Sequence, residues 1–352
     1  MKRICVARFG AIGDLLMTTP VLRALHRTYP GVHVTYIVGK GLGDVVSGLP
    51  TVQEVIEFDK SADVRPDRFL PLLERLQHRR YDAYINLQRS VKTVILGWGS
   101  GARATLTYRR TDRRDVAGRR QHSVDNFLET VRPLGIDPAA CDRHLDFAIP
   151  ADAVESCERL LEEIGIHPES PLLLVNPGAS APSRRWTSER LAETLTALKH
   201  QFRGHALAVC GGKGDDQALS AAAIAQCGLP VFDLAGKTSL KETGALLRRA
   251  ALLITGDTGP MHLAAAVGTP MVALFGPTDA DRTGPMASAP DRRRGNGLPM
   301  ILQDRDGLAC APCMARTCLR GDQECLRRLT PERIVEEASR VIRGVRPVPP
   351  SA

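Results

Sequence analysis

Short apolar segments alternate with helical patterns along most of the chain, and this alternation constrains the fold more than any other feature. Residues 4–7 predict a buried strand, residues 15–28 a helix with apolar positions at helical spacing, and residues 32–38 a second strand. The two strand segments contain no Asp, Glu, Lys or Arg, as expected of strands that are buried on both faces. Such a strand–helix–strand succession predicts a parallel sheet with crossover helices.

The same alternation begins again after a break, which predicts two Rossmann-like α/β domains in series. A helix over residues 154–164 is followed by glycine and proline residues, and we place the boundary near residues 165–170. We therefore predict an N-terminal domain over residues 1–167, a C-terminal domain over residues 168–330, and a last helix with a tail over residues 331–352. The elements predicted in the second domain are residues 171–178, 189–202, 205–212, 215–225, 231–236, 240–249, 251–256, 260–267 and 271–276.

Composition narrows the classes of partner. The net charge of +8 suits an anionic substrate or an anionic membrane surface. Aromatic residues make up 4% of the chain, too few for the stacking platforms of single-stranded nucleic-acid binders, so we expect no nucleic-acid partner. Arg8 and Asp14 interrupt the apolar core that a secretory signal would need, so we expect a cytoplasmic protein.

Three common nucleotide or metal signatures are absent or weak. The first strand is followed by Gly10 and Gly13 only, which does not complete the glycine pattern of nicotinamide sites. A Gly-Lys-Thr string at Gly236 lacks the earlier glycine of a phosphate-binding P-loop, because Val231 stands there. The Asp-Ala-Asp string at residues 279–281 has the form of a metal site, but strings of three residues often arise by chance.

The turn over residues 8–14 is the first candidate site, because it joins a buried strand to a helix at the carboxyl edge of the first sheet, where ligands of open α/β sheets bind. Gly10 and Gly13 would allow a substrate to approach the backbone closely. Asp14 stands at the start of the helix, where it would either cap free amides or act as a general base. The sequence leaves both roles open.

The second candidate site lies where a strand over residues 251–256 meets the next helix. Asp257, Thr258 and Gly259 open that helix, and His262 follows one turn later. Amides at a helix N-terminus, together with a threonine hydroxyl, form a site suited to a diphosphate. His262 is either a packing residue or a ligand contact. Arg184 belongs to a third loop after a strand, and a guanidinium matches phosphate oxygens well.

These motifs together resemble glycosyltransferase family 9, which includes the ADP-heptose lipopolysaccharide heptosyltransferases. The resemblance runs from RFGAIGDLLMTTPVLRAL through NPGAS, SRRW, GGKGDD and LAGKTSL to GDTGPMHLAAAVGTPMVALFGPTD, and the last block is the most specific. It implies a GT-B fold, with two Rossmann-like domains facing across a cleft. It also implies an inverting, metal-independent transfer of heptose from ADP-heptose to an acceptor hydroxyl of lipopolysaccharide core or a related glycan.

The resemblance also implies roles for individual residues. Asp14 matches the proposed general base of the family. Arg184 stands where the family usually has a phosphate-binding lysine, and Asp215 lies near an acidic donor contact. Gly10 and Gly13 belong to the substrate turn. The loop that would bind the donor diphosphate consists of Asp257, Thr258, Gly259 and His262.

Two other functions are compatible with the same motifs. A GT-B nucleotide-sugar epimerase would need additional acid and base residues, and none can be identified in the sequence. A non-catalytic protein that binds nucleotide sugars would need only the donor loops. Turnover of the donor, with its loss when Asp14 is replaced, separates a glycosyltransferase from both alternatives.

Four cysteines lie within sixteen residues near the end of the chain, with spacings of two, four and six residues between them. This spacing is compatible with a structural zinc or iron site, with reduced thiols in a compact loop, or with disulfides. We expect no part for them in catalysis. They are Cys310, Cys313, Cys318 and Cys325.

Basic residues are concentrated between residues 89 and 120, a segment that contains nine Lys or Arg and only two acidic residues. A solvated loop would explain this, but in the N-terminal domain the segment also suits an anionic acceptor, such as a phosphorylated glycolipid at the inner membrane. We therefore expect peripheral contact with that membrane. The basic residues are Arg89, Lys92, Arg103, Arg109, Arg110, Arg113, Arg114, Arg119 and Arg120.

Overall fold

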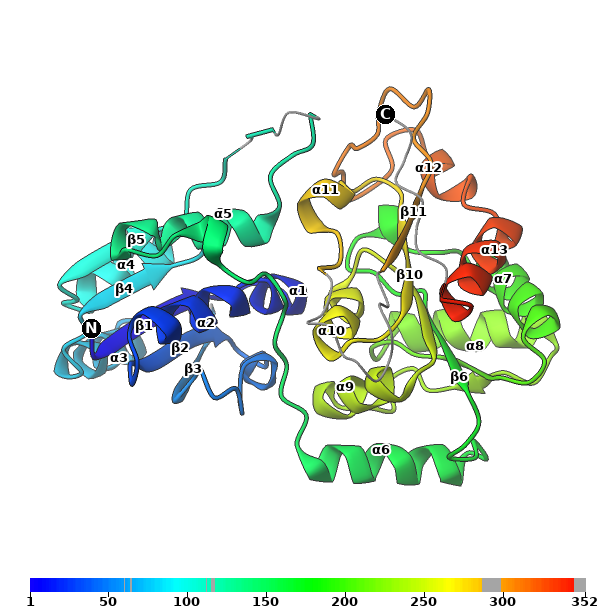
Figure 1. The fold of residues 1–352 in the computed structure, drawn as a ribbon, viewed down its shortest axis with the longest axis horizontal. Helices are drawn as coiled ribbons and strands as arrows, with labels where there is room; N and C mark the ends of the chain where they lie inside the picture. Colours follow the sequence, from blue (N-terminus) through cyan, green and yellow to red (C-terminus); the bar gives the residue numbers. More distant parts are fainter. Residues whose placement is uncertain (60, 64, 112, 115–117, 287–298, 345–352) are drawn as a thin grey trace. The chain divides into compact units, whose positions relative to one another are not determined.

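Two parallel sheets organise the chain, and each belongs to its own unit (Figure 1). The structure is a computed structural model that describes residues 1–352 except 60, 64, 112, 115–117, 287–298 and 345–352. Its contacts divide the chain into Met1–Ala148 and Ile149–Ala352, here called the N-terminal unit and the C-terminal unit. Each unit has Rossmann-like strand–helix alternation, so the predicted α/β class with two Rossmann-like domains is confirmed.

The N-terminal unit contains a five-stranded sheet with the order β3-β2-β1-β4-β5. Its strands are β1 Arg3–Arg8, β2 His33–Gly39, β3 Glu54–Phe58, β4 Ala83–Asn86 and β5 Ala104–Thr107. Its α-helices are α1 Ile12–Leu16, α2 Thr19–Thr28, α3 Pro66–His78, α4 Val91–Gly99 and α5 Ser123–Thr130, and short 3-10 helices cover Gly43–Val45, Arg132–Leu134 and Pro138–Ala140.

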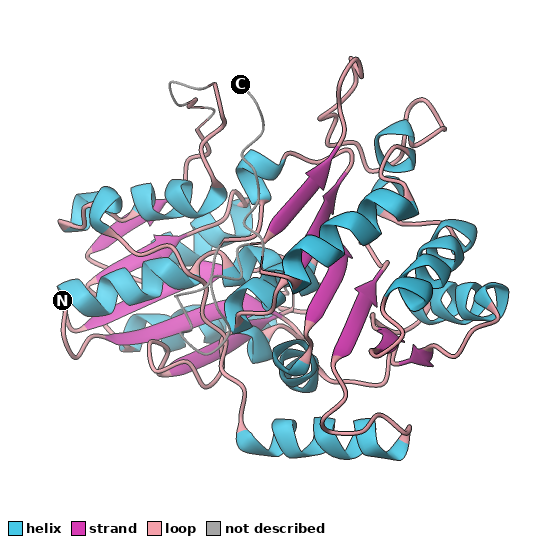
Figure 2. Cartoon of the chain, turned by 45° about the vertical axis from the view of Figure 1, so that its right-hand side comes forward, coloured by secondary structure: helices cyan, strands magenta, loops and turns pink. Residues whose placement is uncertain are grey.

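The C-terminal unit contains a six-stranded sheet with the order β11-β10-β9-β6-β7-β8. Its strands are β6 Leu172–Asn176, β7 Ala206–Val209, β8 Phe232–Asp233, β9 Leu252–Gly256, β10 Met271–Phe275 and β11 Met300–Gln303. Its α-helices are α6 Ala151–Glu163, α7 Ser188–Gln201, α8 Asp215–Cys227, α9 Leu240–Arg249, α10 Gly259–Val267, α11 Ala280–Thr283, α12 Glu324–Arg327 and α13 Pro331–Ile342, and Pro182–Arg184 form a 3-10 helix. Figure 2 shows helices lying against the strands in each unit.

The strand orders fix where a ligand can bind in each unit. In the N-terminal sheet β1 pairs with β2 on one side and with β4 on the other. In the C-terminal sheet β6 pairs in the same way with β7 and β9. The direction of winding therefore reverses between β1 and β4, and again between β6 and β9. Ligands of open α/β sheets bind outside the carboxyl ends of the strands at such reversal points.

The predicted helix over residues 15–28 is two helices, which corrects the sequence analysis. Thr18 separates α1 from α2, and its hydroxyl donates to the carbonyl of Leu15 at 2.6 Å. The same hydroxyl lies 2.6 Å from the buried Tyr36 hydroxyl, and Pro20 stands in the first turn of α2. A threonine that hydrogen-bonds back to the preceding turn, followed by a helix-starting proline, interrupts an otherwise continuous apolar pattern.

The boundary between the units also differs from the predicted one near residues 165–170. Helix α6 precedes that segment, yet it packs against α9 and so belongs to the C-terminal unit. Cys157 and Leu161 on α6 are buried, and the Ser156 hydroxyl donates to Glu242 of α9 at 2.5 Å. The glycine and prolines after α6 predicted a boundary at the end of this helix, whereas its packing places α6 in the C-terminal unit. Helix α13 also belongs to this unit, and residues 345–352 of the predicted tail lie outside the described residues.

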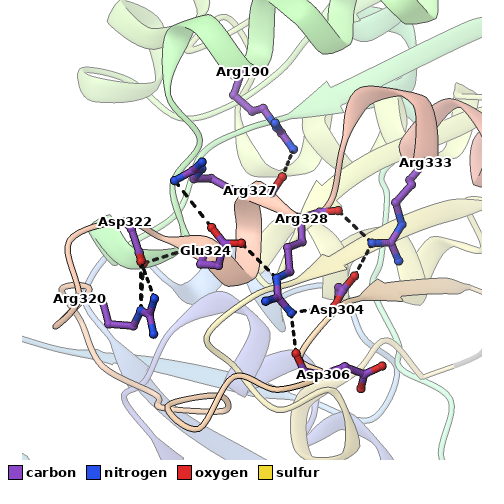
Figure 3. A network of polar contacts seen from close by, with 9 residues as sticks. All are labelled: Arg190, Asp304, Asp306, Arg320, Asp322, Glu324, Arg327, Arg328 and Arg333. Atoms are coloured by element: carbon purple, nitrogen blue, oxygen red, sulfur yellow. Dashed lines mark hydrogen bonds and ion pairs between the residues drawn. The ribbon is translucent and has the colours of Figure 1, made fainter.

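A network of charged side chains ties α12 and α13 to the end of β11 (Figure 3). Arg333 donates to Asp304 at 2.6 Å, and Arg328 donates to the carbonyl of Asp306 at 2.6 Å and to Glu324 at 3.2 Å. The Arg333 guanidinium holds the pKa of Asp304 below its usual range. The network thereby fixes the last helices to the sheet.

We expect the substitution Arg333→Met to lower the melting temperature near neutral pH and to have little effect in acid. A carboxyl whose folded pKa is depressed contributes its full stabilisation above its unfolded pKa, about 4, and this contribution is lost as the pH falls further, through the depressed folded pKa. A loss of about 2–4 °C corresponds to ~1 kcal/mol in a domain of this size. Thermal melts at about pH 7 and about pH 3 measure it. Arg343→Met, at the C-cap of the same helix, is the matched control, and an equal loss at both pH values would contradict an electrostatic role.

Within the part of the chain that the structure describes, no helix is both long and apolar enough to cross a membrane.

Candidate functional site

At the reversal point of the N-terminal sheet, Asp14 is held by an arginine. Arg8 ends β1, and its Nη2 lies 2.7 Å from Asp14 Oδ2 on α1. A Cβ on Gly10 would lie 3.0 Å from Arg8 Nε and 3.1 Å from Asp14 Oδ2, so the glycine leaves room for this pair. Gly13 is buried within α1. The Asp14 side chain is 38% exposed. This carboxylate is therefore both oriented by the protein and accessible to a ligand.

Arg8 is itself fixed by the elements around it. Its Nη1 donates to the carbonyl of Leu87, just after β4, at 2.5 Å. Its guanidinium lies 5.2 Å from the centre of the Phe127 ring on α5, a cation–π distance. Asp14 makes no capping hydrogen bond at the start of α1, so the structure does not support the capping alternative. A contact between Arg8 and Asp14 was not predicted, although a charged residue at the end of a buried strand indicates a role in a site.

At the reversal point of the C-terminal sheet, Arg184 meets the loop that follows β9. Arg184 lies in the 3-10 helix after β6, and its Nη1 donates to the carbonyl of Asp257 at 3.2 Å and to Asp257 Oδ2 at 3.4 Å. Asp257 is 8% exposed, and the Thr283 hydroxyl also donates to its Oδ2 at 3.5 Å. The two predicted site residues Arg184 and Asp257 are thus in direct contact.

Thr258 occupies the N-cap position of α10, but its side chain makes no capping hydrogen bond. Its hydroxyl instead lies 3.2 Å from that of Thr255 at the end of β9. Gly259 begins the helix, and His262 is 4% exposed within its first turns. Because the Thr258 side chain does not cap the first amides of α10, these amides are suited to an anion, as the sequence predicts.

The acidic residues of α8 have different surroundings from those expected. Asp215 is largely exposed, and its Oδ2 pairs with Arg185 at 2.7 Å. The next residue, Asp216, turns toward the strand ends and accepts from the Gly212 amide at 2.9 Å. A Cβ on Gly178 would lie 2.4 Å from Asp216 Oδ2, so only glycine fits beside this carboxylate. The position of the Asp216 carboxylate beside the strand ends was not predicted, although Asp216 is the second Asp of the GGKGDD motif.

The structure gives the predicted metal sites no support. Cys310, Cys313, Cys318 and Cys325 are free thiols that line a common pocket of about 30 Å³. Among the residues that the structure describes, no three metal-ligating side chains come together as an ion would require, and no disulfide forms at these four thiols. Backbone amides, that of Gln323 first, lower the pKa of Cys318, whereas burial raises the pKa of Cys325. These observations favour the alternative of reduced thiols in a compact loop.

The Asp-Ala-Asp string is explained by local structure. The carboxylate of Asp279 accepts from the amide of Asp281 and caps α11. Asp279 is 4% exposed, and Arg305 lies 3.8 Å from it. A buried cap paired with an arginine is a structural role, so the weaker metal interpretation of this string is not supported.

The part of the basic segment that follows β5 is exposed, as a solvated or ligand-binding loop would be. Arg109, Arg110, Arg113 and Arg114 are all exposed, and Arg114 donates to the carbonyl of Gly118 at 2.6 Å. The two acidic residues of the segment, at positions 112 and 115, lie outside the described residues. These four arginines are therefore at the surface, where an anionic partner can reach them.

The pattern of glycosyltransferase family 9 (heptosyltransferase) matches residues 69–294. The chain belongs to glycosyltransferase family 9. It is 25% identical over 294 residues to the lipopolysaccharide core heptosyltransferase OpsX of Haemophilus influenzae, covering 81% of this chain and 82% of that protein. It is 29% identical to lipopolysaccharide heptosyltransferase 3 of Escherichia coli, covering 76% of this chain and 80% of that protein.

A solved family 9 structure has the same fold. The glycosyl transferase family 9 protein of Veillonella parvula superposes with a TM-score of 0.82 at 24% identity, covering 97% of this chain and 98% of that one. The present chain is an enzyme of the glycosyltransferase class, because its family and its relatives are glycosyltransferases. The resemblance stated from the sequence motifs is confirmed.

Proposed function

We propose that this family 9 member transfers heptose from ADP-heptose to an acceptor hydroxyl of lipopolysaccharide core, with inversion at the anomeric carbon and without a metal ion. The observation that carries the proposal is the contact of Arg184 with the loop Asp257–Gly259 at the reversal point of the C-terminal sheet. A guanidinium beside uncapped helix amides forms a site for a diphosphate. Similarity to heptosyltransferases supports the choice of sugar and acceptor.

In the proposed mechanism the donor diphosphate lies at the N-terminus of α10. Amides at Thr258 and Gly259, the dipole of α10 and Arg184 stabilise the negative charge that develops as the diphosphate leaves. Fixed donors of this kind stabilise the transition state without reorganising during the reaction. No cofactor takes part in this scheme.

Asp14 acts as the general base. Arg8 engages Asp14 Oδ2, and no hydrogen bond to Asp14 Oδ1 is found among the described residues, so Oδ1 can accept the proton of the acceptor hydroxyl. The hydroxyl oxygen attacks the anomeric carbon from the face opposite the diphosphate, and the carbon–oxygen bond to the diphosphate breaks. A distance of ~2.6–3.2 Å between the carboxylate and the hydroxyl is required for this proton transfer.

The basic segment supports an anionic acceptor, and we place the enzyme in the cytoplasm at the inner membrane face. Incubation with ADP-heptose and candidate acceptors, followed by mass spectrometry of the products, tests the proposal directly. A heptosylated product together with free ADP is the expected result. Donor binding without release of ADP would favour a non-catalytic binding protein, and conversion of the free nucleotide sugar to an isomer would favour an epimerase.

A further inference from the structure

Helix α4 presents apolar side chains to water. Val91, Ile95 and Trp98 stand at positions i, i+4 and i+7, so they share one side of the helix. Their exposed fractions are 75%, 43% and 78%. We call these three residues the α4 apolar face. Large apolar groups gathered on one exposed side of a helix mark an interaction surface, whereas single exposed ones do not.

The packing of α4 prevents this face from turning inward. The opposite side of the helix is already buried, with Thr93, Leu96 and Gly97 against the sheet. A Cβ on Gly97 would lie 2.8 Å from the ring of Tyr84, whose hydroxyl donates to the carbonyl of Thr93 at 2.9 Å. The helix is therefore apolar on both sides, and the fold accounts for only one of them.

The neighbouring helix α3 also carries an exposed apolar side chain. Gln77 of α3 donates to the carbonyl of Gly99 at 2.8 Å, and a Cβ on Gly99 would lie 2.6 Å from Leu73, so the two helices are packed together. On α3, one turn before Leu73, Leu70 is 62% exposed. Both of these packed helices of the N-terminal unit therefore carry exposed apolar side chains.

Positive charge flanks this surface along the chain. Arg89 precedes α4 and is exposed. Arg103 follows α4 with a side chain that is 84% exposed and lies 3.5 Å from Asp82. Lys92 is the only charged residue within α4 itself. The exposed arginines of the basic segment come next, after β5. Apolar side chains with basic neighbours match the chemistry of an anionic lipid surface, where acyl chains lie beneath negative headgroups.

We propose that the α4 apolar face binds the surface of an anionic lipid bilayer. Tryptophan favours the boundary between headgroups and acyl chains, because its ring is apolar and its N–H can be hydrated there. A second copy of this chain is a poorer partner, since it would bring like charges of the basic segment together. This inference rests on the proposed function, because binding to the bilayer would bring the enzyme to a lipid-anchored acceptor.

Binding to vesicles tests the inference without any sugar substrate. The intact protein should sediment with phosphatidylglycerol–phosphatidylcholine vesicles, less so at high salt, and weakly with phosphatidylcholine alone. The double substitution Ile95→Gln and Trp98→Gln should weaken binding by about tenfold or more, a change that equals ~1.4 kcal/mol. Leu319→Gln, which alters an apolar residue that is 89% exposed in the C-terminal unit, should leave binding unchanged. Equal binding by the double variant would overturn the proposal.

Tryptophan fluorescence gives a second measurement that does not depend on the double variant. The chain has two tryptophans, Trp98 and Trp186, and Trp186 is 7% exposed. In a Trp186→Phe variant, anionic vesicles should shift the emission of Trp98 to shorter wavelength as the ring leaves water. An unchanged emission, or a self-association that the Ile95 and Trp98 substitutions abolish in the absence of lipid, would overturn the proposal.

ADP binding and release are measured in solution, so a failure of vesicle binding is distinguishable from a failure of the proposed function. An enzyme that turns over a water-soluble acceptor but ignores vesicles would overturn only the membrane inference. A protein that binds vesicles through α4 but transfers no sugar would overturn only the proposed function.

Discussion

Substitution of Asp14 by Asn should reduce sugar transfer by roughly 10²–10⁴-fold, the usual effect of losing a general base. The amide keeps the size of the carboxylate but cannot accept the acceptor proton. Arg8 can still donate to the amide oxygen, so the turn around Gly10 should keep its shape. The loss should therefore appear in kcat, with the affinity for ADP nearly unchanged.

Asp67→Asn is the matched control for this experiment, because Asp67 is an exposed carboxylate of the same unit that is paired with Arg65 at 3.3 Å. Transfer rates are measured by release of ADP at saturating donor and acceptor. If the Asp14 variant turns over as fast as the Asp67 variant, Asp14 has no part in the chemistry and another base must be sought.

Substitution of Arg184 by Met should weaken ADP binding by about 10–100-fold, because a hydrogen bond to a charged group contributes ~1.5–3 kcal/mol. Two effects act in the same direction. The diphosphate loses a guanidinium donor, and the buried carboxylate of Asp257 loses the cation that offsets its charge. The repulsion between that carboxylate and the diphosphate then adds to the loss.

Arg185→Met provides the comparison, since Arg185 is the adjacent residue but pairs with the exposed Asp215. Isothermal titration calorimetry with ADP should show a large loss for the Arg184 variant and a small one for the Arg185 variant. Arg184→Lys should restore part of the affinity, because it keeps the charge without the forked geometry. Equal losses in the two Met variants would place the diphosphate elsewhere.

The sequence was sufficient to predict where the long, strongly patterned helices of the C-terminal unit lie. Helix α9 begins and ends where its pattern predicted, at Leu240 and Arg249, and α13 likewise covers residues 331–342. Strands β3 and β5 of the N-terminal unit were not predicted. Glu54 and Glu57 interrupt the apolar pattern of β3, and the exposed threonines of β5 do the same at the edge of the sheet. Edge strands carry a weak pattern because only part of their surface is buried.

In the candidate sites, individual residues could be predicted from sequence motifs, but their contacts could not. The sequence predicts Asp14, Arg184 and Asp257 as candidate site residues because each follows a strand end in a recognisable motif. It could not reveal that Arg8 pairs with Asp14, or that Arg184 contacts Asp257, since these pairs depend on three-dimensional contacts at the sheet reversal points. The surroundings of Asp215 and Asp216 were likewise not predictable, because neighbouring residues of a helix point in different directions.

The distribution of thiols makes the chain selectively reactive toward alkylating reagents. Burial raises the pKa of Cys157 and of Cys210 to about 12, so these sulfurs are both protonated and shielded. Cys310 and Cys313 are exposed, and backbone amides lower the pKa of Cys318, which favours the nucleophilic thiolate. A maleimide dye should therefore attach first to the loop before α12, which gives the native protein a fluorescent reporter on its C-terminal unit without engineered cysteines.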